Sequence, residues 1–176
     1  ILNTHLAACS ASLLWILIEK LKIGKSTTIG MVTGGVAGLA TITPAAGFVG
    51  PLGAIIIGGL GASLCFFAVG AIKHRYKIDD SLDVFAVHGV GGMLGSILLA
   101  VFALSLDGKG LATGLTIGGQ LQAQLIAVAI VAAYSAVVSV AIAKLVALVI
   151  PMRVEHEAEY EGLDLSSHGE RAYDLD

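Results

Sequence analysis

The stretch that decides the fold is DDSLDVFAVHGVGGMLG, residues 79–95. It begins with three aspartates and then becomes apolar around a single histidine, His88. No Asp, Glu, Lys or Arg occurs between His88 and Leu106. If this run crosses a bilayer, His88 lies at a depth where an ionisable side chain is costly and usually serves a function.

The spacing of the small residues around His88 predicts a helix face with almost no side chains. On a regular α-helix one face would carry Val84, His88, Gly91, Gly92 and Gly95. A single imidazole would then stand on a surface with almost no side chains, beside a neighbouring backbone or a narrow passage. The alternative is a core histidine that hydrogen-bonds a nearby backbone carbonyl. At membrane depth we favour the functional interpretation.

The composition indicates a polytopic membrane protein. Of 176 residues, 56% are hydrophobic and only 13% are charged, and the mean hydropathy is +0.91. A soluble domain carries about 25% charged residues. The 23 glycines exceed the usual ~7%, which fits membrane helices whose backbones approach closely. Cys9 and Cys65 have no metal or redox spacing, and we expect no metal, no cofactor and no nucleic-acid partner.

The apolar runs predict an all-α fold with five transmembrane spans. We place them at about 2–18, 27–42, 49–72, 82–104 and 121–150, which makes residues 1–150 a membrane bundle. Trp15 lies near the end of the first span, where an interfacial aromatic residue is common. The chain begins inside a hydrophobic run without Met, so we expect these residues to be part of a longer protein.

The second span carries a stripe of small residues. Gly30, Gly34 and Gly38 are four residues apart and predict tight packing against a partner helix. The span should end at Thr43-Pro44, because proline has no N–H to donate.

The loops predict the topology. Basic residues follow the first span, at Lys20–Lys25, and the third, at Lys73–Lys77, whereas the other loops carry only Lys109. By the positive-inside rule these two loops face the cytoplasm. Residue 1 is then outside and the C-terminus is cytoplasmic, in the plasma (inner) membrane.

Residues 151–176 form an acidic, polar tail. It holds 8 of the 13 acidic residues of the chain. A solvated tail is one interpretation of such a charge run. However, the segment GLDLSSHGE, residues 162–170, contains leucines and glycines that favour a segment docking in a set conformation.

Several motifs in a fixed order resemble the ammonium transporter (Amt/Mep/Rh) family, on the Amt side. They are Asn3-Thr4, the TPAAGF run at 43–48, the 79–92 block around His88, Arg153-Val154, and the tail signatures at 161–164 and 168–173. The resemblance covers essentially the whole chain. It implies a fold of eleven helices in two inverted five-helix repeats, assembled as a homotrimer, of which this chain would be helices seven to eleven plus the tail.

The resemblance also implies the site residues. His88 matches the second of two pore histidines, and the first would lie in an N-terminal half that precedes Ile1. Asp83 and Val84 fall at the inner side of the histidine site, and Thr33 and Val36 on a helix that lines it. The regulatory positions of the tail would be Gly162, Asp164, His168, Gly169 and Glu170. A PII-type signalling protein would bind at the cytoplasmic side.

The chemistry of ammonium explains why a pore would use these residues. Ammonium is nearly the size of potassium, but it can release a proton. A dry apolar passage excludes a bare cation far more strongly than neutral NH3. A neutral imidazole in that passage can hydrogen-bond ammonia or relay a proton without placing a permanent positive charge in the pore.

Two other functions remain as alternatives to transport. An ammonium sensor would signal its occupancy through the tail. An intramembrane enzyme would need a nucleophile and a base, and Ser135 and Ser139 share a helix face, but no second histidine lies within the core of a predicted span, since His5 is near the end of the first. We therefore favour a transporter over an enzyme.

Overall fold

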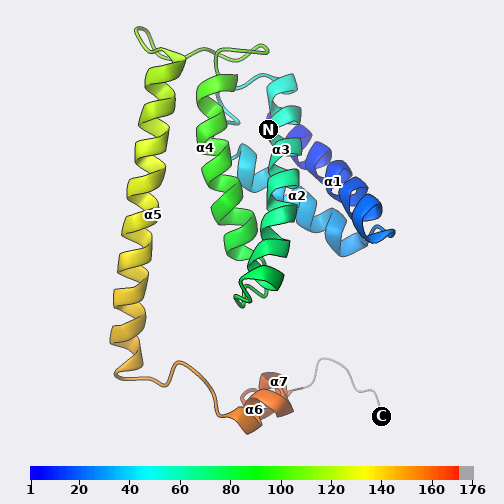
Figure 1. Ribbon diagram of the computed structural model, residues 1–176, viewed down its shortest axis with the longest axis vertical. Helices are drawn as coiled ribbons and strands as arrows, with labels where there is room; N and C mark the ends of the chain where they lie inside the picture. The colour runs from blue at the N-terminus through cyan, green and yellow to red at the C-terminus, as the bar shows by residue number, and fades with distance from the viewer. Residues whose placement is uncertain (171–176) are drawn as a thin grey trace. The chain divides into compact units, whose positions relative to one another are not determined.

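The computed structural model describes residues 1–170, and all regular structure in that range is helical (Figure 1). This confirms the predicted all-α fold. The α-helices are α1 (Leu2–Ile23), α2 (Thr28–Ile42), α3 (Pro51–Gly70), α4 (Val90–Phe102), α5 (Ile117–Ala147), α6 (His156–Glu161) and α7 (Leu163–Ser166). Two π-helical segments, η1 (Ala71–Arg75) and η2 (Val84–Gly89), lie between α3 and α4.

The chain divides into two compact units, and the division falls inside α5. The first unit is Ile1–Ala129, and the second begins at Ile130. Residues 171–176, with Arg171 of the predicted tail signature, lie outside the described range.

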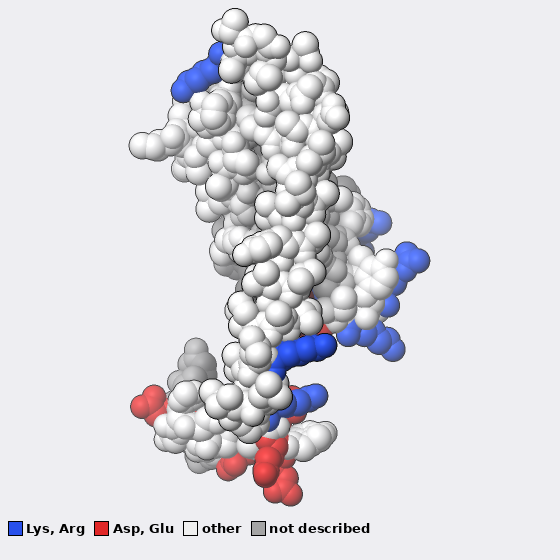
Figure 2. Space-filling view, turned by 90° about the vertical axis from the view of Figure 1, so that its left-hand side faces the viewer, with Lys and Arg blue, Asp and Glu red and all other residues white. Residues whose placement is uncertain are grey.

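Among the described residues, three helical stretches are long and apolar enough to cross a membrane. They are Pro51–Arg75, Val84–Phe102 and Ile117–Ala147, with mean hydropathies of 2.3, 2.0 and 2.6. The 31 residues of α5 make a helix about 46 Å long, longer than a ~30 Å hydrocarbon core. The 15 apolar residues of α2 make only about 22 Å. Most of the surface visible in Figure 2 is free of charged side chains.

Helix α1 is longer than its apolar run predicts. It continues from the expected end at Ile18 to Ile23, where Gly24 adopts the left-handed conformation, with φ 86°, that often ends a helix. Trp15 does not lie on the surface of the bundle. Its side chain is only 4% exposed and packs edge-on against Phe66 of α3, with ring centroids 5.2 Å apart.

The glycine stripe of α2 packs against α1, as predicted. A Cβ atom on Gly34 would lie 2.5 Å from Trp15 Cβ, and one on Gly38 would lie 2.5 Å from Ala11 Cβ. Neither position has room for a side chain. The predicted end of this helix is also confirmed, because α2 stops at Ile42.

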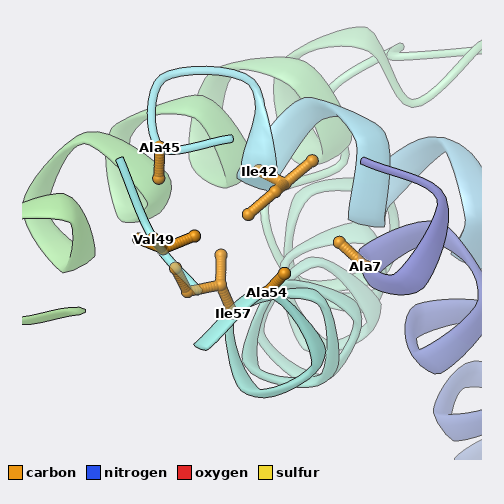
Figure 3. Close-up of a cluster of buried hydrophobic side chains, with 6 residues drawn as sticks. All are labelled: Ala7, Ile42, Ala45, Val49, Ala54 and Ile57. Atoms are coloured by element: carbon orange, nitrogen blue, oxygen red, sulfur yellow. The ribbon is translucent and has the colours of Figure 1, made fainter. Parts of the chain in front are cut away.

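One apolar cluster holds the first three helices together with the turn after α2. Figure 3 shows its buried side chains, which are Ala7, Ile42, Ala45, Val49, Ala54 and Ile57. Asn3 ties the start of α1 to the same turn, because its Nδ2 donates hydrogen bonds to the carbonyls of Ala46 at 3.0 Å and Val49 at 2.7 Å. This interaction gives a structural role to the Asn3 of the sequence motif.

Helix α4 meets α2 through glycine. Gly91 and Gly95 are buried, and a Cβ on either would collide with Thr41. Thr41 is itself fully buried, and its hydroxyl donates to the Ala37 carbonyl at 2.8 Å. The backbones of α2 and α4 are therefore in close contact at Gly95, about two turns beyond His88.

Candidate functional site

The candidate site is centred on η2, the π-helical segment that carries His88. Ala86 and Val87 of this segment are buried, whereas Val84, Phe85 and His88 are exposed on the first unit. One side of η2 thus packs on the bundle, and the other presents the imidazole outward.

Contrary to the sequence prediction, the structure does not place Gly91, Gly95 and His88 on one common face. Gly91 and Gly95 are buried against Thr41, whereas His88 is exposed. The spacing argument assumed 3.6 residues per turn, but hydrogen bonds in a π-helix span five residues instead of four. The wider turn changes the direction of residues 84–89 relative to α4. Gly92 differs from the other two, since a Cβ there would meet no atom within 4 Å.

The buried side of η2 anchors the segment to α2 and α3. Val87 is 2% exposed and belongs to a cluster with Ala11, Trp15, Ala37, Ala62 and Cys65. The Cys65 thiol lies 3.7 Å from the Val87 carbonyl oxygen. Val36 packs against this cluster, so the structure brings that predicted site residue close to the residue before His88.

Thr33 lies on the same helix as Val36 and is half-buried. Its hydroxyl donates to the Ile29 carbonyl at 2.9 Å within α2.

The amino end of η2 is capped by Asp80, which sequence analysis did not single out. One carboxylate oxygen accepts the N–H of Val84 at 2.8 Å, and the other accepts those of Phe85 at 3.0 Å and Ala86 at 3.2 Å. The first N–H groups of a helix have no partner within the helix, so a carboxylate here satisfies three of them and balances the positive end of the helix dipole. The sequence signal was an aspartate four residues before the helix.

Asp83 is paired with Lys73. The Lys73 ammonium lies 2.8 Å from Asp83 Oδ1, with 32% and 19% of the two side chains exposed. Asp83 has a left-handed backbone, with φ 56°. Its placement directly before Val84 agrees with the sequence motif, but its partner on η1 was not predicted.

Glu19 is a second carboxylate that the sequence analysis missed. It is 8% exposed and accepts hydrogen bonds from the backbone N–H of Thr27 at 2.7 Å and its hydroxyl at 3.0 Å. A Cβ on Gly30 would lie 2.6 Å from its carboxylate oxygens, so glycine there makes room for it. Glu19 lies within α1, directly before the basic residues that begin at Lys20, and the apolar pattern of the first span gives no signal for its burial.

The tail segment 162–170 has an ordered local fold. Gly162 and Gly169 both have positive φ, at 96° and 67°, and the Glu170 N–H donates to the Asp164 carbonyl at 3.0 Å. His168 is exposed. Upstream, the Arg153 guanidinium contacts both oxygens of Glu159 at 3.0 Å. The predicted regulatory residues therefore lie in one compact turn.

Comparison with known proteins relates this chain to a family. The model of the Ammonium Transporter Family matches residues 1–173. The ammonium transporter of Bacillus subtilis (strain 168) is 41% identical over 174 residues, which is 98% of this chain and 43% of that protein. Ammonium transporter Amt1 of Archaeoglobus fulgidus is 43% identical over 172 residues, covering 97% of this chain and 43% of the relative.

Solved structures similar to this chain point to the same family. The crystal structure of Candida albicans Mep2 has a TM-score of 0.76 at 34% identity, covering 89% of this chain and 36% of that one. A structure titled Sensor Amt Protein has a TM-score of 0.86 at 30% identity, covering 95% and 41%.

This chain thus spans less than half the length of these relatives. The relatives, together with the apolar helices, make it part of an integral membrane protein. Its match to the family model over nearly every residue agrees with the motifs around His88, and the chain belongs to the ammonium transporter family.

Proposed function

We propose that this chain is the C-terminal half of a transporter that moves ammonium across a membrane, with η2 as part of the pore wall. The observation that carries the proposal is the exposure of His88 and Val84 on a segment whose other side is buried. Structural histidines are usually enclosed by hydrogen-bonding partners, whereas this imidazole faces away from its own bundle. Family membership supplies the substrate class.

The face that carries His88 is proposed to be completed by the N-terminal half. The chain covers 43% of the length of its bacterial relative, so a full-length protein of that size would contain a further stretch longer than this chain to form the opposite wall. That half would supply the first pore histidine, beside His88. A pore between two halves explains why neither half encloses the site alone.

In this proposal ammonium gives up its proton, to water or to a relay through His88, and NH3 crosses the apolar passage. The cost of placing a bare cation in hydrocarbon excludes potassium, which has no proton to release. His88 binds ammonia through one ring nitrogen or relays the proton. Val84 and Asp83 lie at the inner end of the passage, and Thr33 and Val36 line it from α2.

The proposal is tested by replacing His88 with alanine in the full-length protein that contains this chain. His74→Ala is the matched control, because His74 is also an exposed histidine but belongs to the basic η1 segment. We expect His88→Ala to lose or alter selective ammonium uptake while His74→Ala retains it. Uptake, selectivity and pH dependence equal to wild type in His88→Ala would refute the assignment.

The proposal also includes the orientation of the chain in the membrane and its assembly. Lys22 Nζ lies 5.5 Å from the centroid of the Phe67 ring, so the basic end of α1 is next to the end of α3 that leads into η1. This contact supports placing both basic loops on one side, the cytoplasmic side of the plasma membrane. The protein is proposed to form a homotrimer whose tail is a cytoplasmic regulatory element, with a PII-type protein binding nearby.

A sensor is the second candidate function, because one of the similar structures is titled Sensor Amt Protein. Flux measurement in liposomes separates the two. A transporter moves ammonium at a rate that grows with its gradient, whereas a sensor binds ammonium without sustained flux.

A further inference from the structure

The loop between the two π-helical segments is held by an ion pair that the proposed function does not use. Residues 76–83 connect η1 to η2. Lys73 belongs to η1 and Asp83 directly precedes η2, so their contact at 2.8 Å closes the loop at its two ends. Lys73 also donates to the Ser81 carbonyl at 3.4 Å.

The environment of Asp83 makes this pair more important than an exposed one. Exposed ion pairs contribute little, because water solvates both charges. Here Asp83 Oδ1 is buried and accepts no hydrogen bond of good geometry within residues 1–170. Its charge is therefore balanced by Lys73, and removing one member of such a pair leaves the other charge poorly solvated.

The backbone of Asp83 also needs to be held in place. Its φ of 56° lies in the left-handed region, which is uncommon for residues other than glycine, although Asp, Asn and His adopt it more often than the rest. Such a conformation persists only when surrounding contacts enforce it. The ion pair with Lys73 is a contact of this kind.

A hydrogen bond connects Asp83 to the residue next to His88. The Val87 N–H donates to the Asp83 carbonyl at 2.8 Å, across the first turn of η2. A rotation of the Asp83 backbone would therefore disturb Val87, whose own carbonyl faces the Cys65 thiol. The direction of the His88 side chain depends on this turn.

We propose that Lys73 is a positioning residue that acts through Asp83 to set the π-helical turn, and hence the direction of His88. The inference rests on the proposed function for its effect on transport. Its effect on the η2 backbone is independent of transport.

The test compares four forms of the full-length protein with wild type. Lys73→Gln removes the cation, and Asp83→Asn removes the anion while keeping a side chain that tolerates positive φ. The exchanged pair Lys73→Glu with Asp83→Lys restores the attraction, and Lys77 at φ 53° shows that lysine adopts this backbone here. Arg75→Gln is the control, since it removes an exposed charge from the same segment.

Two measurements are made on each form. Amide hydrogen exchange over residues 84–89 reports the η2 backbone, and the concentration dependence of ammonium uptake separates maximal rate from apparent affinity. We expect the amides of this segment to exchange about tenfold faster in both single variants, and at the wild-type rate in the exchanged pair and in Arg75→Gln. The maximal uptake rate should fall by about tenfold or more in the single variants, because displacing a group from its working position costs rate steeply.

The outcomes are distinguishable. Exchange at the wild-type rate in Lys73→Gln and Asp83→Asn overturns the inference, whatever the transport result. Faster exchange with unchanged maximal uptake overturns it as well. If the wild-type protein carries no flux, the proposed function fails, while the exchange rates still decide whether Lys73 sets the η2 backbone.

Discussion

At the scale of single residues, three carboxylates occupy positions that apolar surroundings make expensive, and each has a specific partner. Asp80 accepts three backbone N–H groups, Asp83 pairs with Lys73, and Glu19 accepts from Thr27. Burial of a charge is tolerated when it is paired or hydrogen-bonded. Two of the three stabilise the amino end of a helix, so these side chains determine where η2 and α2 begin.

Replacing Asp80 with alanine should destabilise the protein by about 0.5–2 kcal/mol, the usual cost of losing a helix cap. Three N–H groups of η2 would lose their acceptor. Thermal unfolding of the purified full-length protein in detergent measures the change. Asp79→Ala is the control, because within residues 1–170 the Asp79 carboxylate accepts only the Ser81 hydroxyl, at 2.6 Å. Equal melting temperatures for the two variants would contradict the capping role.

At the scale of elements, the bundle is assembled by backbone proximity rather than by large side chains. The α1–α2 contact uses Gly34 and Gly38, and the α2–α4 contact uses Gly91 and Gly95. In a membrane, apolar side chains gain little by leaving lipid, so close backbone packing supplies much of the attraction between helices. The abundance of glycine therefore has a direct structural cause.

Gly34→Leu should lower stability by about 1–3 kcal/mol or more, because the new side chain would overlap Trp15. Gly70→Leu is the control, since a Cβ at Gly70 would meet no atom within 4 Å. Trimer yield and melting temperature in detergent should fall for the first variant and stay near wild type for the second. Normal values for Gly34→Leu would show that α1 and α2 can separate without cost.

At the scale of the whole molecule, this chain carries one wall of a proposed two-walled pore. His88 and Val84 are exposed, and the chain covers 43% of its bacterial relative. The proposal that the other half completes the site has a direct consequence for the isolated chain.

The 176-residue chain by itself should show no selective ammonium flux in liposomes. A half-pore exposes its polar groups to lipid, where they have no partner. The full-length protein in the same liposomes is the positive control. Ammonium-selective flux from the purified fragment would mean that one half, or a dimer of it, makes a pore.

The tail should influence transport from a distance. Gly162 has φ 96°, and a Cβ there would lie 2.7 Å from Asp164 Oδ1, so Gly162→Asp should unfold the 162–170 turn and alter uptake. Ser167→Asp is the control, because it adds the same charge at a residue whose φ is −104°. Uptake by both variants and by a chain truncated after Pro151 is compared. Wild-type uptake and PII response in all three would identify the segment as a solvated tail.

The sequence alone determined the features that depend on local pattern. The all-α class follows from long apolar runs, the end of α2 from Pro44, and the α1–α2 contact from glycines four residues apart. The family follows from motifs that are contiguous in the chain. Each of these signals is contained in a window of a few turns, where hydrophobic periodicity and glycine spacing are informative.

Only the tertiary structure decided how His88 is presented. The segment η2 is capped by Asp80 and preceded by the Lys73–Asp83 pair, and its Val87 packs against residues from α1, α2 and α3. Trp15 is a core residue because it packs against Phe66 and because Gly34 leaves space for it. The apolar pattern is the same for an α-turn and a π-turn, so the choice between them depends on long-range contacts that the sequence does not display.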